Sequence, residues 1–174
     1  MKLEWSHTVL NIKDADKMLD FYIGTLGFNI SDRGPLAEKG PEIIFMSQDP
    51  NEHHQIGLIV SREDEGPSNS LNHLSFRVES FEDIKIIKNN LESANVEILP
   101  LCHGNALSLY FKDPEGNGLE VFWDTPWHVS QPQVVVWDAD LDEKEALDWV
   151  EDTFSDKPGF IRQEDNKSDF VNRN

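Results

Sequence analysis

The sequence has little cysteine, few basic residues and no long apolar run. Its single cysteine, Cys102, excludes an intramolecular disulfide and a cysteine-based zinc cluster. Lys and Arg number 15 against 33 Asp and Glu, which gives a formal net charge of −18. Nucleic acids and anionic lipids are bound by basic surfaces, so we expect neither as a partner. No apolar stretch approaches the roughly 20 residues of a membrane helix, and the first residues lack a signal-peptide pattern, so we expect a cytoplasmic protein.

The predicted secondary structure repeats once along the chain. Each half is predicted to contain a strand, a helix and then three strands, which is a βαβββ unit. In the first half these elements are expected at residues 5–11, 15–23, 28–32, 42–48 and 54–60. In the second half they are expected at residues 71–78, 81–93, 96–99, 107–112 and 118–123.

This repeat predicts an α+β fold. We expect one domain over residues 1–124, made of two paired βαβββ modules at about 1–62 and 70–124. A single module leaves one face of its sheet unburied, so pairing should give a curved, barrel-like sheet around a central metal site. Residues 125–174 should form a C-terminal extension with one helix. The spacing of Asp140 and Glu143 predicts a capping box for that helix, and the acidic end beyond Arg162 is expected to be disordered.

Three residues suggest a metal site. Glu120 stands among apolar residues of a predicted strand, where a carboxylate is costly to bury unless it is paired or binds a metal. His7 and His73 are each the third residue of the opening strand of their half. Two histidines and one carboxylate are the ligand set of a non-haem Fe(II) facial triad. The alternatives are two structural histidines and, for Glu120, an ion pair with Arg77.

The segment from His103 to Glu120 carries a resemblance to a known family. In it, His103 is followed by Leu109-Tyr110, by the turn Asp113-Pro114-Glu115-Gly116, and then by Glu120. This order resembles the signature of type I extradiol ring-cleaving dioxygenases. Together with the paired βαβββ plan and the segment 21–28 that closes the first helix, it resembles the vicinal oxygen chelate superfamily, which includes glyoxalases, epimerases, antibiotic-resistance proteins and dioxygenases. The likeness covers about residues 1–124 and points to the single-domain branch.

The resemblance implies a role for each candidate residue. His7, His73 and Glu120 correspond to the metal ligands, and His54 corresponds to the acid/base histidine. His103 and Tyr110 correspond to groups around the metal that hold substrate and oxygen. The implied cofactor is Fe(II), with Mn(II) as the alternative, and the implied reaction is cleavage of a small aromatic diol by O₂.

Two other functions stay open at this point. Metal-dependent lyases and isomerases of the glyoxalase or epimerase type use a further carboxylate in the first half, at the position that corresponds to Glu120. Glu120 comes seven residues after Asp113, and the residue seven positions after Asp49 is Ile56, which is apolar. Three protein ligands would then remain, leaving about three sites on an octahedral metal for a catecholate and O₂. His54, two residues before Ile56, would share its strand face and lie near the metal. A metal-free protein that binds small molecules is the second alternative, and pairing of module edges leaves a homo-oligomer open.

Overall fold

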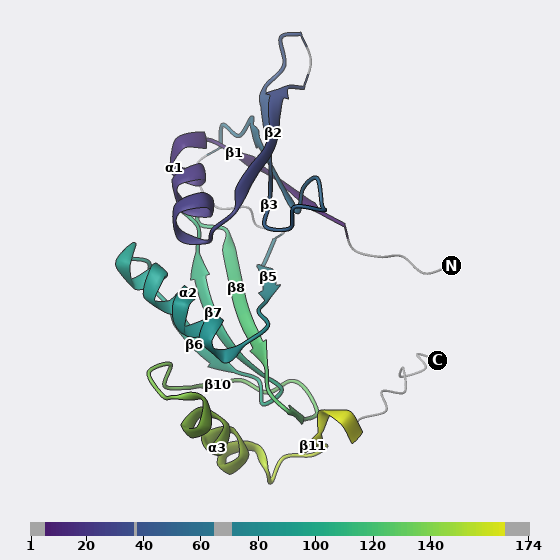
Figure 1. The fold of residues 1–174 in the computed structure, drawn as a ribbon, viewed down its shortest axis with the longest axis vertical. Coiled ribbons are helices and arrows are strands. Elements are labelled where there is room, and N and C mark those ends of the chain that lie inside the picture. Colours follow the sequence, from purple (N-terminus) through teal and green to yellow (C-terminus); the bar gives the residue numbers. More distant parts are fainter. Residues whose placement is uncertain (1–5, 37, 65–70, 166–174) are drawn as a thin grey trace, which may run out of the picture. The chain divides into compact units, whose positions relative to one another are not determined.

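The computed structural model describes residues 6–36, 38–64 and 71–165, which form an α+β fold with mixed sheets. The chain divides into two compact units: unit 1 comprises residues 1–72 and 112–117, and unit 2 comprises residues 73–111 and 118–174. The α+β class is confirmed. The expected barrel is not confirmed. The described strands form separate open sheets, in which the two outer strands do not pair with each other (Figure 1). No described helix is both long and apolar enough to cross a membrane.

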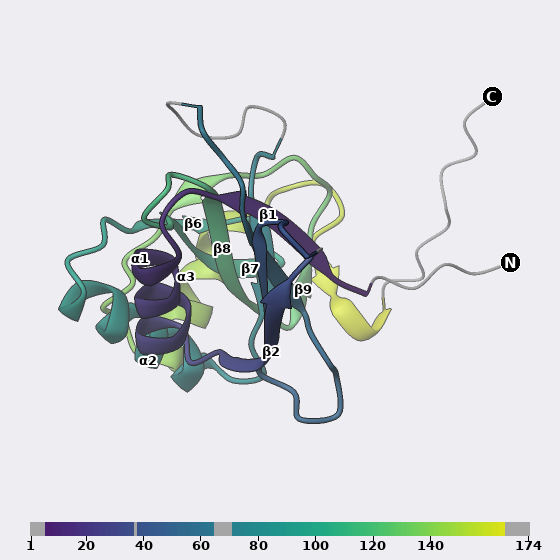
Figure 2. The ribbon, with the colours of Figure 1, turned by 90° about the horizontal axis from the view of Figure 1, so that it is seen from above.

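Unit 1 has the expected βαβββ order. Its sheet has the strand order β1-β4-β3-β2, with β1 parallel to β4 and the other pairs antiparallel. Helix α1 lies beside these strands (Figure 2), and Asp14 caps it by accepting from the Lys17 amide at 3.1 Å. The elements are β1 (Thr8–Ile12), α1 (Ala15–Leu19), the π-helical η1 (Asp20–Thr25), β2 (Asn29–Pro35), β3 (Glu42–Ser47) and β4 (Ile56–Val60).

Unit 2 repeats this topology and extends it. The sheet order is β10-β6-β7-β8-β5, and the opening strand β5 is again parallel to the last strand, β8. Helix α2 buries Phe81, Ile84 and Leu91, and a capping box between Ser80 and Asp83 begins it. The elements are β5 (Leu74–Arg77), α2 (Phe81–Ser93), β6 (Leu99–Cys102), β7 (Ala106–Lys112), β8 (Gly118–Asp124), β9 (Trp127–His128), β10 (Val135–Val136), α3 (Glu143–Phe154), β11 (Ile161–Arg162) and the 3-10 turn η2 (Gln163–Asp165).

Several predicted boundaries were wrong by a few residues. The candidate histidines were expected inside strands, but His7 and His73 immediately precede β1 and β5, and His54 lies before β4. In each case the strand begins only where ladder pairing begins, as at Thr8, which pairs with Ile56. The predicted capping box of α3 is also displaced by two residues, since Asp142 and Glu145 form it.

The C-terminal extension is more ordered than expected. Strand β10 pairs antiparallel with β6, and β11 pairs with β9, so both add to unit 2. The prediction of disorder from Arg162 onward was therefore wrong for residues 162–165, while residues 166–174 lie outside the described part of the chain. The predicted domain boundary at residue 124 stays a prediction.

The turn that links β7 to β8 is anchored in unit 1 by Glu115. Its Oε1 accepts the backbone N–H groups of Lys13 at 2.5 Å and Asp14 at 2.9 Å. Arg62 lies 3.4 Å from Oε2, and both of these charged side chains are only 8% exposed. One carboxylate thus satisfies the backbone that leads into α1.

Replacing Glu115 by Ala should therefore lower the free energy of unfolding by about 2–3 kcal/mol, because two partly buried N–H groups lose their acceptor. Glu115→Gln, which keeps one acceptor oxygen, should lose less. Urea unfolding curves would measure both variants, with the exposed Glu97→Ala as a control. A loss for Glu115→Ala no larger than that of the control would contradict the anchoring role.

Asp113, in the same turn, is a buried carboxyl with four donors around it. Oδ1 accepts the amides of Glu115 and Asn117, while Oδ2 faces the Asn117 side chain at 2.7 Å and the Tyr22 hydroxyl at 3.3 Å. Burial nevertheless outweighs these hydrogen bonds and raises the pKa of Asp113 above its ordinary value. The neutral form is therefore favoured more in the folded chain than in the unfolded chain.

This shift predicts a pH dependence of stability with a definite sign. Because the folded pKa is raised, the contribution of Asp113 is fully present below the ordinary value of 3.8 and is lost as pH rises through the folded pKa. Asp113→Asn removes this titration. Denaturant titrations measure the free energy of unfolding of both proteins. The difference, variant minus wild type, should thus increase with pH across that range. A difference that stays flat or falls would contradict the raised pKa.

Candidate active site

Unit 2 gathers three of the candidate residues around a fourth, the buried carboxylate of Glu120. Glu120, on β8, is 7% exposed, and its strand partner on β5 is Ser75, whose hydroxyl donates to it. The Nε2 of His73 lies 3.5 Å from Oε2 of Glu120, and the Nε2 of His103 lies 3.9 Å from Oε1. Glu120 is therefore buried with polar partners, which offset the cost of burying its charge.

The alternative partner for Glu120 is excluded by the position of Arg77. Its guanidinium lies over the Phe122 ring and pairs with Asp124 at 2.9 Å. Burial acts to raise the pKa of Glu120, but hydrogen bonds from Ser75 and other neighbours outweigh it, so the pKa lies below its ordinary value. The carboxylate is thus ionised at neutral pH, as a metal ligand must be.

The pair formed by His73 and Glu120 fits a divalent cation. Two ligand atoms at adjacent corners of an octahedron, each about 2.1 Å from the metal, are about 3 Å apart. The observed separation of 3.5 Å is close to that value. A neutral imidazole with a carboxylate is also a donor set that divalent iron and manganese accept.

His103 and Tyr110 form a second layer beside this pair. The Nε2 of His103 and the hydroxyl of Tyr110 are 3.1 Å apart, and the Tyr110 ring lies edge-on to His73 at 5.4 Å between centroids. Burial first, and then the hydrogen bond with Glu120 and its negative charge, raise the pKa of the Tyr110 hydroxyl. Tyr110 therefore remains a protonated donor at neutral pH.

Unit 1 holds the other two candidate histidines together. The rings of His7 and His54 are 4.2 Å apart between centroids, and Phe45 lies 4.5 Å from His54. Ser6 contacts Nδ1 of His7 at 3.0 Å, while the Nδ1 atoms of His53 and His54 are 2.8 Å apart. Burial, followed by the neighbouring His7 and His53, lowers the pKa of His54. At neutral pH, His54 is thus a neutral imidazole that can accept a proton.

The predicted ligands are divided between the units. His73 and Glu120 belong to unit 2, and His7 belongs to unit 1. Within the described residues, no group of three or more His, Cys, Asp or Glu side chains is arranged to hold a metal ion. The three-ligand site therefore stays a prediction, supported by the chemistry of its donor set.

Strand register corrects one sequence argument. Thr8 pairs with Ile56 in unit 1, as Leu74 pairs with Leu119 in unit 2. The first-half counterpart of Glu120 is therefore Gly57, one residue beyond the position reached by counting. Gly57 carries no side chain, so the conclusion that the first half supplies no carboxylate is unchanged.

Sequence reasoning missed two serines on the same strand faces as the candidate residues. Ser75 is two residues from His73, and Ser108 is two residues from Tyr110, so alternation along a strand could have found both. The Ser108 hydroxyl is buried and has no hydrogen-bond partner in the described part of the chain.

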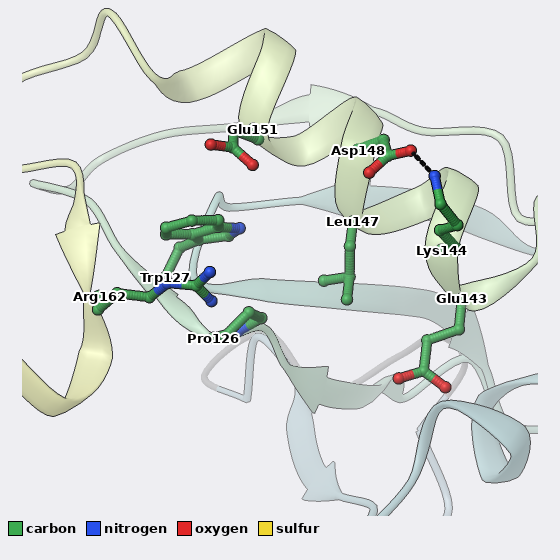
Figure 3. A pocket seen from close by; sticks show the side chains of 8 residues that line it. All are labelled: Pro126, Trp127, Glu143, Lys144, Leu147, Asp148, Glu151 and Arg162. Atoms are coloured by element: carbon green, nitrogen blue, oxygen red, sulfur yellow. Dashed lines mark hydrogen bonds and ion pairs between the residues drawn. The ribbon is translucent and has the colours of Figure 1, made fainter.

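A hollow of about 420 Å³ in unit 2 contains none of these candidates. Figure 3 shows the Arg162 side chain lying over Trp127, with its guanidinium 3.9 Å from the ring centroid. This face of the indole is thus already occupied by a cation of the chain itself. The lining residues are Pro126, Trp127, Glu143, Lys144, Leu147, Asp148, Glu151 and Arg162.

Comparisons with known proteins give one family model, distant relatives and a shared fold. A sequence model described as the Glyoxalase/Bleomycin resistance protein/Dioxygenase superfamily matches residues 5–121. Biphenyl-2,3-diol 1,2-dioxygenase 2 of Rhodococcus globerulus is 26% identical over 123 residues, which are 68% of this chain but only 61% of that enzyme. The trivalent organoarsenical cleaving enzyme of Bacillus sp. (strain MD1) is 25% identical over 127 residues, covering 70% of this chain and 73% of the enzyme. A domain from Frankia sp. EAN1pec shares the fold, with a TM-score of 0.62, 20% identity, and coverage of 74% of this chain and 96% of that one.

Proposed function

The chain belongs to the Glyoxalase/Bleomycin resistance protein/Dioxygenase superfamily, and on this premise we propose that it is an Fe(II)-dependent extradiol dioxygenase that cleaves a catechol-type ring with O₂. The observation that carries the proposal is the grouping of His73, His103 and Tyr110 around the buried carboxylate of Glu120. A biphenyl-diol dioxygenase is among the relatives, although this chain spans about three fifths of its length.

The metal would be held by His7, His73 and Glu120. When bound, Fe(II) supplies adjacent coordination sites for the diol and O₂ and a route for electrons between them. Mn(II) is the alternative with the same ligand preferences. The ionised state of Glu120 suits this role, as does the 3.5 Å separation from His73.

The remaining candidates would handle protons and orientation. His54, neutral at physiological pH, would take a proton from the diol and return it later. Tyr110, held in its protonated state, would donate its one proton to Nε2 of His103, and its hydroxyl oxygen would accept a hydrogen bond from a hydroxyl of the diol. His103 would orient Tyr110 through the 3.1 Å contact of its Nε2.

Two alternatives make different predictions about oxygen and metal. A lyase or isomerase of the glyoxalase or epimerase type would use the metal without consuming O₂. The absence of a carboxylate at Gly57, the counterpart of Glu120, weighs against the four-ligand form of that chemistry. A metal-free small-molecule-binding protein would not require His73 to lie beside Glu120, so this contact weighs against that alternative.

An oxygen-electrode screen of catechols tests the proposal. Protein purified without oxygen and reconstituted with Fe(II) should consume O₂ with at least one catechol and form a yellow ring-opened product. Reconstitution with Mn(II) in parallel identifies the preferred metal. Stoichiometric metal binding without O₂ uptake across the screen would favour the lyase or isomerase, and failure to bind metal would favour the binding protein.

A further inference from the structure

The C-terminal extension, outside the family match at residues 5–121, holds the imidazole of His103. The Nδ1 of His103 lies 2.7 Å from the carbonyl oxygen of Gln133. The Gln131 side chain joins the same two residues: its Nε2 donates to the His103 carbonyl at 2.8 Å, and its Oε1 accepts the Gln133 amide at 2.9 Å. One amide side chain thus bridges the end of β6 and the segment that presents the Gln133 carbonyl.

The orientation of the Gln131 amide is determined by its neighbours. Besides the His103 carbonyl, its Nε2 faces the Asn105 side-chain oxygen at 3.2 Å and the Val129 carbonyl at 3.4 Å. All three are acceptors, whereas the Gln133 amide is a donor. A flipped amide would place an oxygen against three oxygens and an NH₂ group against an N–H. Only the observed orientation satisfies every group.

The contact with Gln133 decides which nitrogen of His103 carries a proton. A carbonyl oxygen can only accept, so Nδ1 must be protonated in both the neutral and the charged imidazole. The neutral ring then has its lone pair at Nε2, the nitrogen that lies 3.1 Å from the Tyr110 hydroxyl and 3.9 Å from Glu120.

We infer that Gln131 is a positioning residue, which fixes the tautomer of His103 through the Gln133 carbonyl so that Nε2 keeps its lone pair toward Tyr110. This inference rests on the proposed function for its catalytic meaning, because a lone pair at Nε2 is what allows His103 to orient Tyr110. The extension would then supply part of the site, although it lies beyond the region shared with the family.

Nitrogen NMR of the histidine rings tests this assignment directly. The metal-free full chain is measured at one alkaline pH, and the His103 signals are identified by their absence in His103→Phe. The wild type should show the Nδ1–H tautomer of His103 as the dominant form. Gln131→Ala should raise the fraction of the Nε2–H tautomer roughly five- to ten-fold, as expected for losing about one hydrogen bond. Because the Gln131 side chain is exposed, this variant should still fold.

Gln133→Ala is the matched control. It removes a side chain whose one hydrogen bond within the described residues is to the Ser130 carbonyl, at 3.0 Å, but keeps the backbone carbonyl that contacts His103. Its tautomer should equal that of the wild type. With Fe(II) and a catechol, Gln131→Ala should lower kcat more than it changes KM, at unchanged metal content.

The outcomes separate the inference from the proposed function. A wild-type His103 that is mainly Nε2–H, or a tautomer unaffected by Gln131→Ala, overturns the positioning role whatever the activity. If the tautomer responds as expected but no catechol supports O₂ uptake, the positioning role holds and the dioxygenase proposal fails. A wild-type spectrum that is mainly Nε2–H overturns the inference even if the variant does not fold.

Discussion

Replacing Glu120 by Gln should weaken metal binding by more than about 100-fold and abolish turnover. Loss of an outer-layer partner already costs 10- to 100-fold in metal affinity, and Glu120 would be a ligand itself. Gln keeps the shape and one acceptor for Ser75 but removes the negative charge. The variant should therefore fold normally without metal.

Metal-dependent stabilisation provides a measurement independent of activity. At a metal concentration 100 times the dissociation constant, the wild type should gain about 2.7 kcal/mol of unfolding free energy, and Glu120→Gln should gain almost none. Glu97→Gln, a surface substitution of the same kind, should behave as the wild type. Full metal binding by Glu120→Gln would remove Glu120 from the ligand set.

The elements of the fold could be predicted from periodicity because local patterns determine them. The helix at residues 81–93 was predicted at its observed bounds, since Ser80 caps it and its apolar residues recur at helical spacing. Strand ends were less accurate because they depend on pairing with distant residues. The register that makes Gly57 the counterpart of Glu120 is one example, since counting from the turn reached Ile56 instead.

The candidate site could be predicted only in part, for a related reason. A carboxylate in an apolar strand and a histidine at the same place in each predicted opening strand are visible in the sequence, and so Glu120 and His73 were named as candidates. The contact between His103 and Gln133 joins residues that are far apart in the chain through a backbone carbonyl, which has no residue-specific signal. The anchoring of Asp14 by Glu115 is likewise a backbone contact across the chain.

Replacing His54 by Ala should lower turnover by about 10²- to 10⁴-fold while metal binding and catechol binding are retained. That range is the usual contribution of a positioned acid/base group. His54 is suited to this role because its pKa is lowered by burial and by the neighbouring histidines, so that it is neutral and basic near pH 7. Steady-state kinetics, metal content and catechol titration on the same preparations would measure the three quantities.

His53 offers the matched control for this experiment. It adjoins His54 in the chain, but its side chain is 57% exposed and faces Asp32 at 3.7 Å. His53→Ala should therefore keep turnover within about three-fold, because His53 would exchange no proton with the substrate and would act only through its contact with His54. Equal losses from both variants would mean that the pair acts as a unit through its 2.8 Å contact. Loss of metal from His54→Ala would make His54 a ligand and restore a four-ligand, glyoxalase-like site as the better explanation.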